Sequence, residues 1–379
     1  MADHHGQGQV DRLCLSRRAL LARGVQAGAA FAGLGALATG CGSSSTGGSS
    51  APSAASGPPS GTVTFMNYPG YMPQSMVAAF NKKYSKVKIT QVAGDLNGDV
   101  QAAGQVIQNH GSYDMAYLTA ASVEQALQAG VIGKPDFSKM PNIRNVDPKF
   151  RSSYPWGFPT DYGKNSFAYR KDLISERPTT WQEFWQIIPK YSGKVVFYQY
   201  DRVVIGSSLL GLGHDPNTTD PVEIKAATKQ VIAAKPHLLE FASTNVAKSL
   251  AQGSAVLILD YDADAAAYIE KNPNIVWVNP SDGLTSYLEG WVAIKGTSEL
   301  PAVETMMNFF MQPKPYSLYA NLLPTYGTIA GVKPYLLPSI RTNPALVPPP
   351  SGVKLYFETY LGAEATKRWN DAWQQIQAA

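Results

Sequence analysis

Cysteine is almost absent from the 379 residues, and both cysteines, Cys14 and Cys41, lie near the N-terminus. The rest of the chain therefore has no thiol for a disulfide framework, a cysteine nucleophile or a cysteine-based metal site. An excess of one charge is also missing, because 32 lysines and arginines stand against 28 aspartates and glutamates. Without a long basic run or stripe, we expect no nucleic-acid partner.

Catalytic motifs are missing as well. The sequence has no Gly-x-Ser-x-Gly elbow, no phosphate-binding Gly-x-x-x-x-Gly-Lys loop and no His-Glu-x-x-His pair. Beyond the N-terminal segment the histidines are His110, His214 and His237, which lie far apart and each adjoin a glycine or proline. We therefore expect no enzyme activity, no cofactor and no metal site.

The N-terminus reads as an export signal. Arg17 and Arg18 precede an apolar stretch over residues 24–40, a pattern typical of twin-arginine signals. The stretch is too rich in glycine and alanine for a membrane span of roughly 20 strongly apolar residues. We predict a cleaved signal peptide over residues 1–40.

A lipid-attachment motif follows this signal. Residues 37–41, Leu-Ala-Thr-Gly-Cys, resemble a bacterial lipobox, with Ala38 where leucine is usual, and would leave Cys41 as the lipidated first residue. Residues 41–61 are rich in glycine and serine, a composition typical of a flexible tether. The sequence thus predicts a domain anchored through Cys41 to the outer face of the cytoplasmic membrane.

From Thr62 onward, strand-like and helix-like patterns alternate. The predicted strands cover residues 62–67, 87–92 and 113–118, and the predicted helices cover 74–84, 99–110 and 122–129. This order favours an α/β fold with a mostly parallel sheet covered on both faces. Ligands of such sheets bind at the carboxyl ends of the strands, so the loops at 68–71 and 119–122 become candidate pocket walls.

The second half repeats the theme less regularly. Predicted helices cover 223–234, 301–311 and 364–378, and predicted strands cover 194–198 and 255–259. One further predicted helix is capped by Thr180 and contains Trp181, Phe184 and Trp185. The last strand carries Asp260, Tyr261 and Asp262 at its carboxyl end. These three residues are further candidates for a pocket wall.

Six segments carry a resemblance to a known family. They are NYPGYMP at 67–73, GSYD at 111–114, EQALQAGVI at 124–132, TWQEFW at 180–185, NTTDP at 217–221 and YLEGW at 287–291. In this order they resemble the periplasmic spermidine/putrescine-binding proteins of polyamine ABC importers. The resemblance implies a type II periplasmic-binding-protein fold with two hinge crossovers. Lobe 1 would comprise 62–166 plus 287–330, and lobe 2 would comprise 167–286 plus 331–379.

The resemblance also implies ligand contacts. The matching positions are Tyr68 and Tyr71, Thr119, Tyr261, Tyr287 and Glu289, and a later tyrosine of the family falls loosely on Leu323 or Tyr326. A polyamine needs carboxylates for its ammonium groups and aromatic faces along its methylenes. Glu289 would hold one ammonium.

Some acidic positions of the family are altered here. At three positions where the family has an acidic residue, this chain has Gly70, Tyr200 and Val203. The nearby acidic residues that could take over their role are Asp201, Asp260 and Asp262. A monoamine or a polyol-like solute would also suit a pocket with fewer carboxylates. Ferric iron is another alternative ligand for a tyrosine-rich site, although residues 324–327 supply one tyrosine where the iron-binding relatives have an adjacent pair.

We expect a monomer that delivers its ligand to an ABC permease, or presents it to a receptor.

Overall fold

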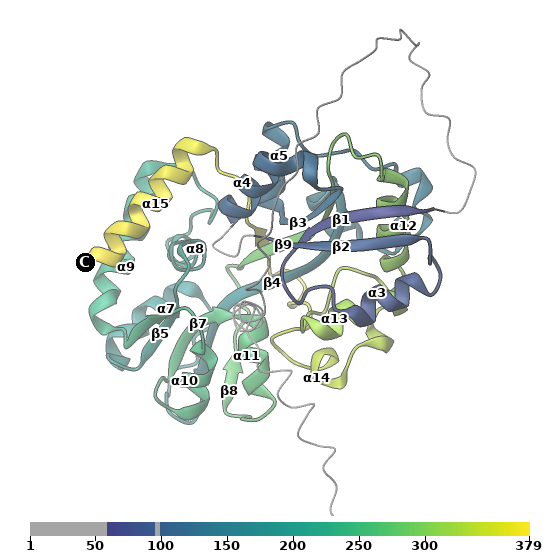
Figure 1. The fold of residues 1–379 in the computed structure, drawn as a ribbon. Helices are drawn as coiled ribbons and strands as arrows, with labels where there is room; N and C mark the ends of the chain where they lie inside the picture. The colour runs from purple at the N-terminus through teal and green to yellow at the C-terminus, as the bar shows by residue number, and fades with distance from the viewer. Residues whose placement is uncertain (1–58, 95–98) are drawn as a thin grey trace, which may run out of the picture.

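The computed structural model describes residues 59–94 and 99–379. The predicted signal peptide, Cys41 and most of the predicted tether lie outside the described residues. One curved sheet runs through the molecule in the order β2-β1-β3-β9-β4-β7-β5-β6, with β10 beside β9 and β8 beside β4. Helices α9 and α15 lie at one end of this sheet, and α3, α13 and α14 lie towards the other (Figure 1).

The N-terminal part of the sheet follows the predicted alternation. It consists of β1 (Gly61–Asn67), β2 (Val87–Ala93) and β3 (Met115–Thr119), which alternate with α3 (Gln74–Asn81), α4 (Asp99–Asn109) and α5 (Ala120–Gln128). Strand β1 pairs in parallel with both β2 and β3. Helix α5 is capped by the side chain of Thr119, which accepts a hydrogen bond from the backbone N–H of Ser122.

The other end of the sheet is built the same way. Its strands are β5 (Val195–Tyr198), β6 (Glu240–Ala242) and β7 (Leu257–Tyr261), and β5 pairs in parallel with the other two. Its helices are α7 (Trp181–Ile187), α8 (Asp201–Gly211), α9 (Pro221–Ala234), α10 (Val246–Gln252), α11 (Asp262–Ile269) and α15 (Ala363–Ala378). Thr180 and Glu183 form a capping box at the start of α7, and Trp181, Phe184 and Trp185 are buried.

Two long strands connect the halves, as the resemblance implies. They are β4 (Gly157–Arg170) and β9 (Leu284–Ala293), which pair antiparallel with each other, while β4 also pairs antiparallel with β7 and with β8 (Ile275–Trp277). The expected mostly parallel sheet is therefore wrong for its centre. Both predicted lobe boundaries at this crossing, 166/167 and 286/287, fall inside these two strands.

The crossing strand β4 carries one extra residue. Pro159 pairs with Gly290 and Asp161 pairs with Glu289, so Thr160 is the additional residue of a β-bulge. From Asp161 onward the pairing is continuous, with Gly163 opposite Tyr287.

The C-terminal region touches both halves. It contains the helices α12 (Leu300–Phe310), α13 (Pro313–Leu322) and α14 (Pro338–Arg341), and the strand β10 (Leu355–Phe357), which pairs with β9. The short helix α6 (Pro148–Ser153) lies earlier in the chain, before β4. The side-chain amide of Asn321 on α13 donates to Tyr335 O and accepts from the backbone N–H of Leu337, at 2.9 Å in each case, which holds residues 335–337 beside α13.

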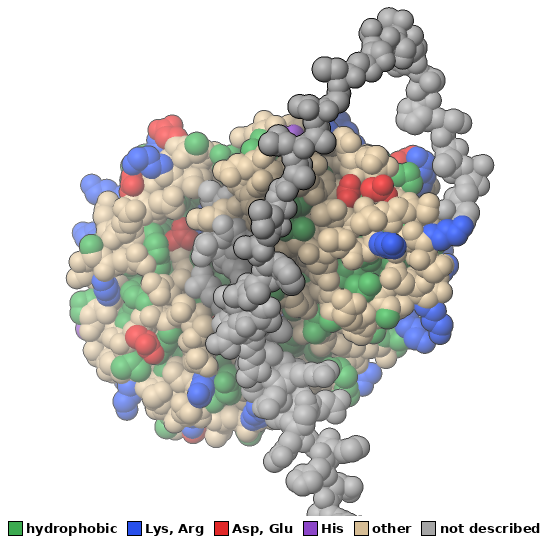
Figure 2. Space-filling model, in the orientation of Figure 1, with side chains coloured by type: hydrophobic (Ala, Val, Ile, Leu, Met, Phe, Trp, Pro, Cys, Tyr) green, Lys and Arg blue, Asp and Glu red, His purple; other side chains and the backbone are tan. Residues whose placement is uncertain are grey.

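Large apolar and aromatic side chains fill both halves, among them Trp181, Trp291 and Trp369, each at most 1 % exposed. Acidic and basic side chains are interspersed over the face seen in Figure 2. In the described part of the chain, no helix combines the length and apolarity needed to cross a membrane.

Candidate ligand-binding site

The two crossing strands turn one face towards the predicted site. Side chains alternate between the faces of a strand, so Asp161, Gly163 and Asn165 of β4 share a face with their partners Glu289, Tyr287 and Thr285 of β9. The side-chain amide of Asn165 donates to Thr285 Oγ1 at 3.2 Å, as this register requires. We call this surface the tyrosine face, because the tyrosines described next lie on it.

Two buried carboxylates and two tyrosine hydroxyls meet on the tyrosine face. The hydroxyl oxygen of Tyr117 lies 2.6 Å from Asp161 Oδ1, 2.8 Å from Glu289 Oε2 and 2.7 Å from the hydroxyl oxygen of Tyr319. Tyr319 also donates to Asp161 Oδ1 at 2.9 Å. Asp161 is 4 % exposed and Glu289 is fully buried. We call these four residues the carboxylate–tyrosine cluster.

In this cluster, the Tyr319 hydroxyl is favoured in its neutral form beside the carboxylate of Asp161. Burial, and then the neighbouring Asp161, raise the pKa of Tyr319 well above its usual value. The tyrosines therefore act as hydrogen-bond donors to the carboxylates. Buried carboxylates are stabilised by such donors and by a nearby cation, so the cluster suits a ligand ammonium group.

Tyr68 and Tyr71 enclose the cluster from the loop after β1. Their rings and the ring of Tyr117 meet edge to face, with centroids 5.3 to 5.5 Å apart. Both predicted residues are thus brought to the same place as Glu289. Such rings offer π faces that attract cations and cover apolar ligand atoms.

Tyr287 and Tyr261 continue the tyrosine face into the second half. A Cβ atom added to Gly163 would lie 2.1 Å from the hydroxyl oxygen of Tyr287, so this ring lies directly across β4. The Tyr261 ring meets Tyr287 at 5.8 Å and Tyr198 at 4.5 Å between centroids. Tyr287 therefore lies two residues before Glu289 on β9, and Tyr261 extends the tyrosine face onto β7.

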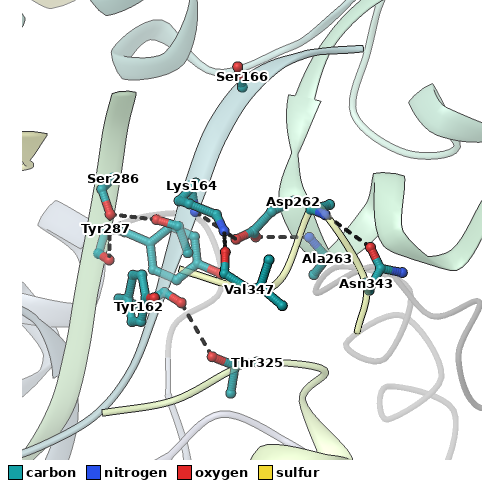
Figure 3. A network of polar contacts seen from close by, with 12 residues as sticks. Tyr162, Lys164, Ser166, Asp262, Ala263, Ser286, Tyr287, Thr325, Asn343 and Val347 are labelled. Atoms are coloured by element: carbon teal, nitrogen blue, oxygen red, sulfur yellow. Dashed lines mark hydrogen bonds and ion pairs between the residues drawn. The ribbon is translucent and has the colours of Figure 1, made fainter. Parts of the chain in front are cut away.

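Asp260 precedes Tyr261 on β7 and points to the opposite face, and Asp262 is the first residue of α11. Asp262 Oδ2 accepts from the backbone N–H of Lys164 at 3.0 Å and lies 3.7 Å from Lys164 Nζ, which donates to Val347 O at 2.7 Å (Figure 3). Burial raises the pKa of Asp262 to about 6 against the opposing effect of Lys164. Burial also lowers the pKa of Lys164.

Asp260 is fully buried in the second half. Burial, and then the neighbouring Asp264, raise the pKa of Asp260 well above its usual range. The structure therefore brings neither Asp260 nor Asp262 to the carboxylate–tyrosine cluster.

Tyr200 and Asp201 border a neighbouring cavity of about 350 Å³ between the halves. The hydroxyl of Tyr200 donates to Glu358 Oε2 at 3.1 Å. Thr119 lies opposite Glu289 in the sheet, and its hydroxyl donates to Ser122 Oγ, which lines the same cavity. Tyr326 borders a different cavity together with Tyr162 and Lys149, away from the cluster.

Sequence reasoning missed Tyr117, Asp161, Tyr319 and Glu358. Tyr117 lies on the predicted strand at 113–118, two residues before Thr119 and on the same face, and Asp161 could have been found from strand alternation, had β4 been identified as a strand. Tyr319 comes from α13 and Glu358 from the end of β10, neither of which was predicted.

Comparison with known proteins identifies the class. The family model described as bacterial extracellular solute-binding protein matches residues 75–348, and the chain belongs to this family. This is a family of solute-binding transport proteins, not of enzymes.

Individual relatives are more specific. The spermidine/putrescine-binding periplasmic protein of Escherichia coli is 23 % identical over 326 residues, covering 84 % of this chain and 92 % of the relative. The putrescine/cadaverine-binding protein of Pseudomonas aeruginosa is 24 % identical over 271 residues, covering 66 % of this chain and 76 % of the relative. Among solved structures, the spermidine/putrescine ABC transporter substrate-binding protein of Streptococcus pneumoniae superposes with a TM-score of 0.72 at 19 % identity, covering 84 % and 99 % of the two chains. This likeness agrees with the predicted two-lobed type II fold.

Proposed function

We propose that this protein is the solute-binding component of an ABC importer and captures a small cationic amine, a polyamine such as spermidine or putrescine, between its two lobes. The proposal assigns lobe 1 to residues 62–166 plus 287–330 and lobe 2 to 167–286 plus 331–379. The lobes would close on the amine and present it to the permease.

One observation carries the proposal: Asp161 and Glu289 are buried side by side within a ring of tyrosines. Two carboxylates supply the charge that an ammonium group requires, and the surrounding rings of Tyr68, Tyr71 and Tyr287 supply cation–π and apolar contact. The relatives named as spermidine, putrescine or cadaverine binders support the same ligand class.

Thermal unfolding of the domain starting at Thr62 tests this function. The panel comprises putrescine, spermidine, spermine, amino acids, sugars and polyols. A ligand that binds only the folded state should add roughly 2.7 kcal/mol of stability at 100 times its dissociation constant. We expect a polyamine response that Glu289→Gln removes.

The exposed Glu270 provides a matched control, because Glu270→Gln changes the same charge at the end of α11 and should leave the response intact. A response to polyols alone would refute the amine ligand while keeping the solute-binding role. Visible colour with ferric iron would support the iron alternative.

Membrane attachment is a separate part of the proposal. The twin-arginine motif and Cys41 support export of the folded chain, cleavage before Cys41 and lipid anchoring on the outer face of the cytoplasmic membrane. Labelling with a fatty-acid analogue should mark the wild-type protein and not Cys41→Ser. Equal labelling of both would exclude Cys41 as the attachment site.

A further inference from the structure

We propose that an exposed surface formed by α13 and the segment that leads into α14 contacts the headgroup layer of an anionic membrane. This inference goes beyond the solute-binding role, and it rests on the proposed membrane attachment for the nearness of a bilayer. We call this surface the α13–α14 patch, and its residues are Lys314, Leu318, Lys333, Tyr335, Leu337 and Arg341. Helices α13 and α14 lie close together, on the half of the molecule that contains β1 (Figure 1).

Three large apolar side chains of the patch are exposed and lie on one surface. Leu318 is 40 % exposed, Tyr335 46 % and Leu337 37 %. The side-chain amide of Asn321 donates to Tyr335 O and accepts from the N–H of Leu337. Leu318 precedes Asn321 by three residues and therefore shares its face of α13. Single exposed apolar residues are common, whereas a group of them on adjoining segments indicates a contact surface.

Two exposed lysines flank this apolar group. Lys314 precedes Leu318 by four residues and lies on the same face of α13. Lys333 belongs to a segment that runs beside the start of α13, because a Cβ atom on Gly331 would lie 3.7 Å from Pro313 Cγ. The two ammonium groups therefore extend from neighbouring segments of one surface.

The third basic residue and the lack of acids make the patch positive. The backbone N–H of Arg341 donates to Leu337 O at 2.9 Å, so both residues lie on one turn of α14. Residues 305–357 contain no aspartate or glutamate, and α3, which packs against α13, has none either. The adjoining cavity has Asp147 in its wall, which accepts from the N–H of Lys149 at 3.0 Å, and the Lys149 ammonium balances that charge.

This combination of groups matches the surface of a bilayer. Basic side chains are attracted to anionic headgroups within about a Debye length of the membrane. Tyrosine rings and leucine side chains gain free energy by entering the boundary between headgroups and acyl chains. Long lysine side chains can reach headgroup phosphates from several positions, so the contact requires no complementary protein shape.

The N-terminal chain is long enough to allow this contact. It enters the domain beside the start of α12, because a Cβ atom on Gly61 would lie 1.8 Å from Glu299 Oε2. Helix α12 has 11 residues, which corresponds to about 16 Å, and it leads directly to α13. Residues 41–60 can span up to about 70 Å. A domain attached through Cys41 could therefore turn the α13–α14 patch onto the membrane that holds it.

Co-sedimentation with vesicles tests the inference on residues 41–379 carrying Cys41→Ser, so that no lipid on the protein contributes to binding. Vesicles of equal parts phosphatidylglycerol and phosphatidylcholine are compared with vesicles of phosphatidylcholine alone. We expect binding to the anionic vesicles, at least about tenfold weaker binding to the zwitterionic ones, and loss of binding in 1 M salt, where the Debye length is about 3 Å.

A charge variant and a matched control locate the contact. The triple variant Lys314→Gln, Lys333→Gln and Arg341→Gln should weaken binding to anionic vesicles about tenfold to a hundredfold. The control removes three exposed lysines from α9 and α10 in the other half, and should change binding by less than about threefold. Its substitutions are Lys225→Gln, Lys229→Gln and Lys248→Gln.

A second variant tests the apolar part of the patch. Leu318→Ser combined with Tyr335→Ser leaves the charge unchanged and should weaken vesicle binding about threefold to tenfold. Both side chains are exposed, so the thermal midpoint should stay near that of wild type, which checks that the variant folds.

The outcomes separate this inference from the proposed function. Equal binding of wild type and the triple patch variant, or no vesicle binding by wild type, would refute the membrane contact. Dimers in analytical ultracentrifugation that Leu318→Ser and Tyr335→Ser abolish, without vesicle binding, would assign the patch to a second copy of the chain and also refute it. Amine binding and lipid labelling of Cys41 are measured independently, and neither result depends on the vesicle experiment.

Discussion

Replacing Gly163 by alanine tests the geometry of the tyrosine face at its tightest point. A Cβ atom at Gly163 would lie 2.1 Å from Cζ and Oη of Tyr287 and 2.3 Å from its Cε1 atom. Non-bonded carbon atoms prefer about 3.5 to 4.0 Å, so the ring must move by more than about 1 Å. Gly163 is absent from the positive-φ residues, so the cost of alanine is steric and not conformational.

The expected magnitude follows from overpacking and from the lost ligand contact. Added atoms in a packed site typically cost about 1–3 kcal/mol of stability. A displaced Tyr287 also loses its cation–π and apolar contact with the ligand, which should weaken binding about threefold to thirtyfold. Gly104→Ala in α4 is the control, because nothing lies within 4 Å of the new Cβ atom, and it should stabilise the protein by about 0.5–1 kcal/mol.

A double-mutant cycle measures the effect. Urea unfolding and amine titration would be carried out on wild type, Gly163→Ala, Tyr287→Ala and the double variant. In the Tyr287→Ala background the added methyl group meets no ring, so Gly163→Ala should cost less than about 0.5 kcal/mol. Additive costs in the two backgrounds would show that the Tyr287 ring does not lie across β4.

Three further predictions concern stability. The folded-state pKa of Asp262 is raised from 3.8 to about 6, so this carboxyl adds stability that is complete below about pH 4 and is lost as pH rises through 6. The thermal midpoint of wild type relative to Asp262→Asn should therefore rise on acidification, and a pH-independent difference would contradict this. Lys164→Met leaves the buried Asp262 without its cation and should cost about 3–5 kcal/mol in urea unfolding, whereas adding Asp262→Leu should recover part of the loss. Thr180→Ala removes the capping box of α7 and should cost about 1 kcal/mol, and an unchanged urea midpoint would show that the box contributes nothing.

Local patterns predicted much of the fold. The strands at β1, β2, β5 and β7 and the helices at α4, α9 and α15 were found to within two residues, because each has a clear period or a cap. The strand β4 was missed, because Asp161, Lys164 and Asn165 interrupt its hydrophobic pattern although all three are buried. Their burial depends on partners from distant parts of the chain, which no local pattern shows.

The site was predicted in part for the same reason. Tyr68, Tyr71, Tyr287 and Glu289 were named from the resemblance, and the structure brings them together. The acids beside Tyr261 were proposed as a group, yet Asp260 precedes Tyr261 on β7 and points to the other face, and Asp262 begins α11 and bonds the backbone of Lys164. Asp161 was overlooked because the relevant alternation is visible only once β4 is paired with β9.

The extra residue Thr160 decides the sign of the charge that the crossing strand presents to the solute. If β4 paired with β9 without the bulge, the register would place Lys164 opposite Thr285 and turn its ammonium towards the tyrosine face. Asp161 would then turn to the back of the strand. A one-residue slip of β4 against β9 at this point would thus exchange the acid of β4 for a base on the tyrosine face without any substitution. The bulge therefore sets which of the two charged groups the crossing strand turns towards the solute.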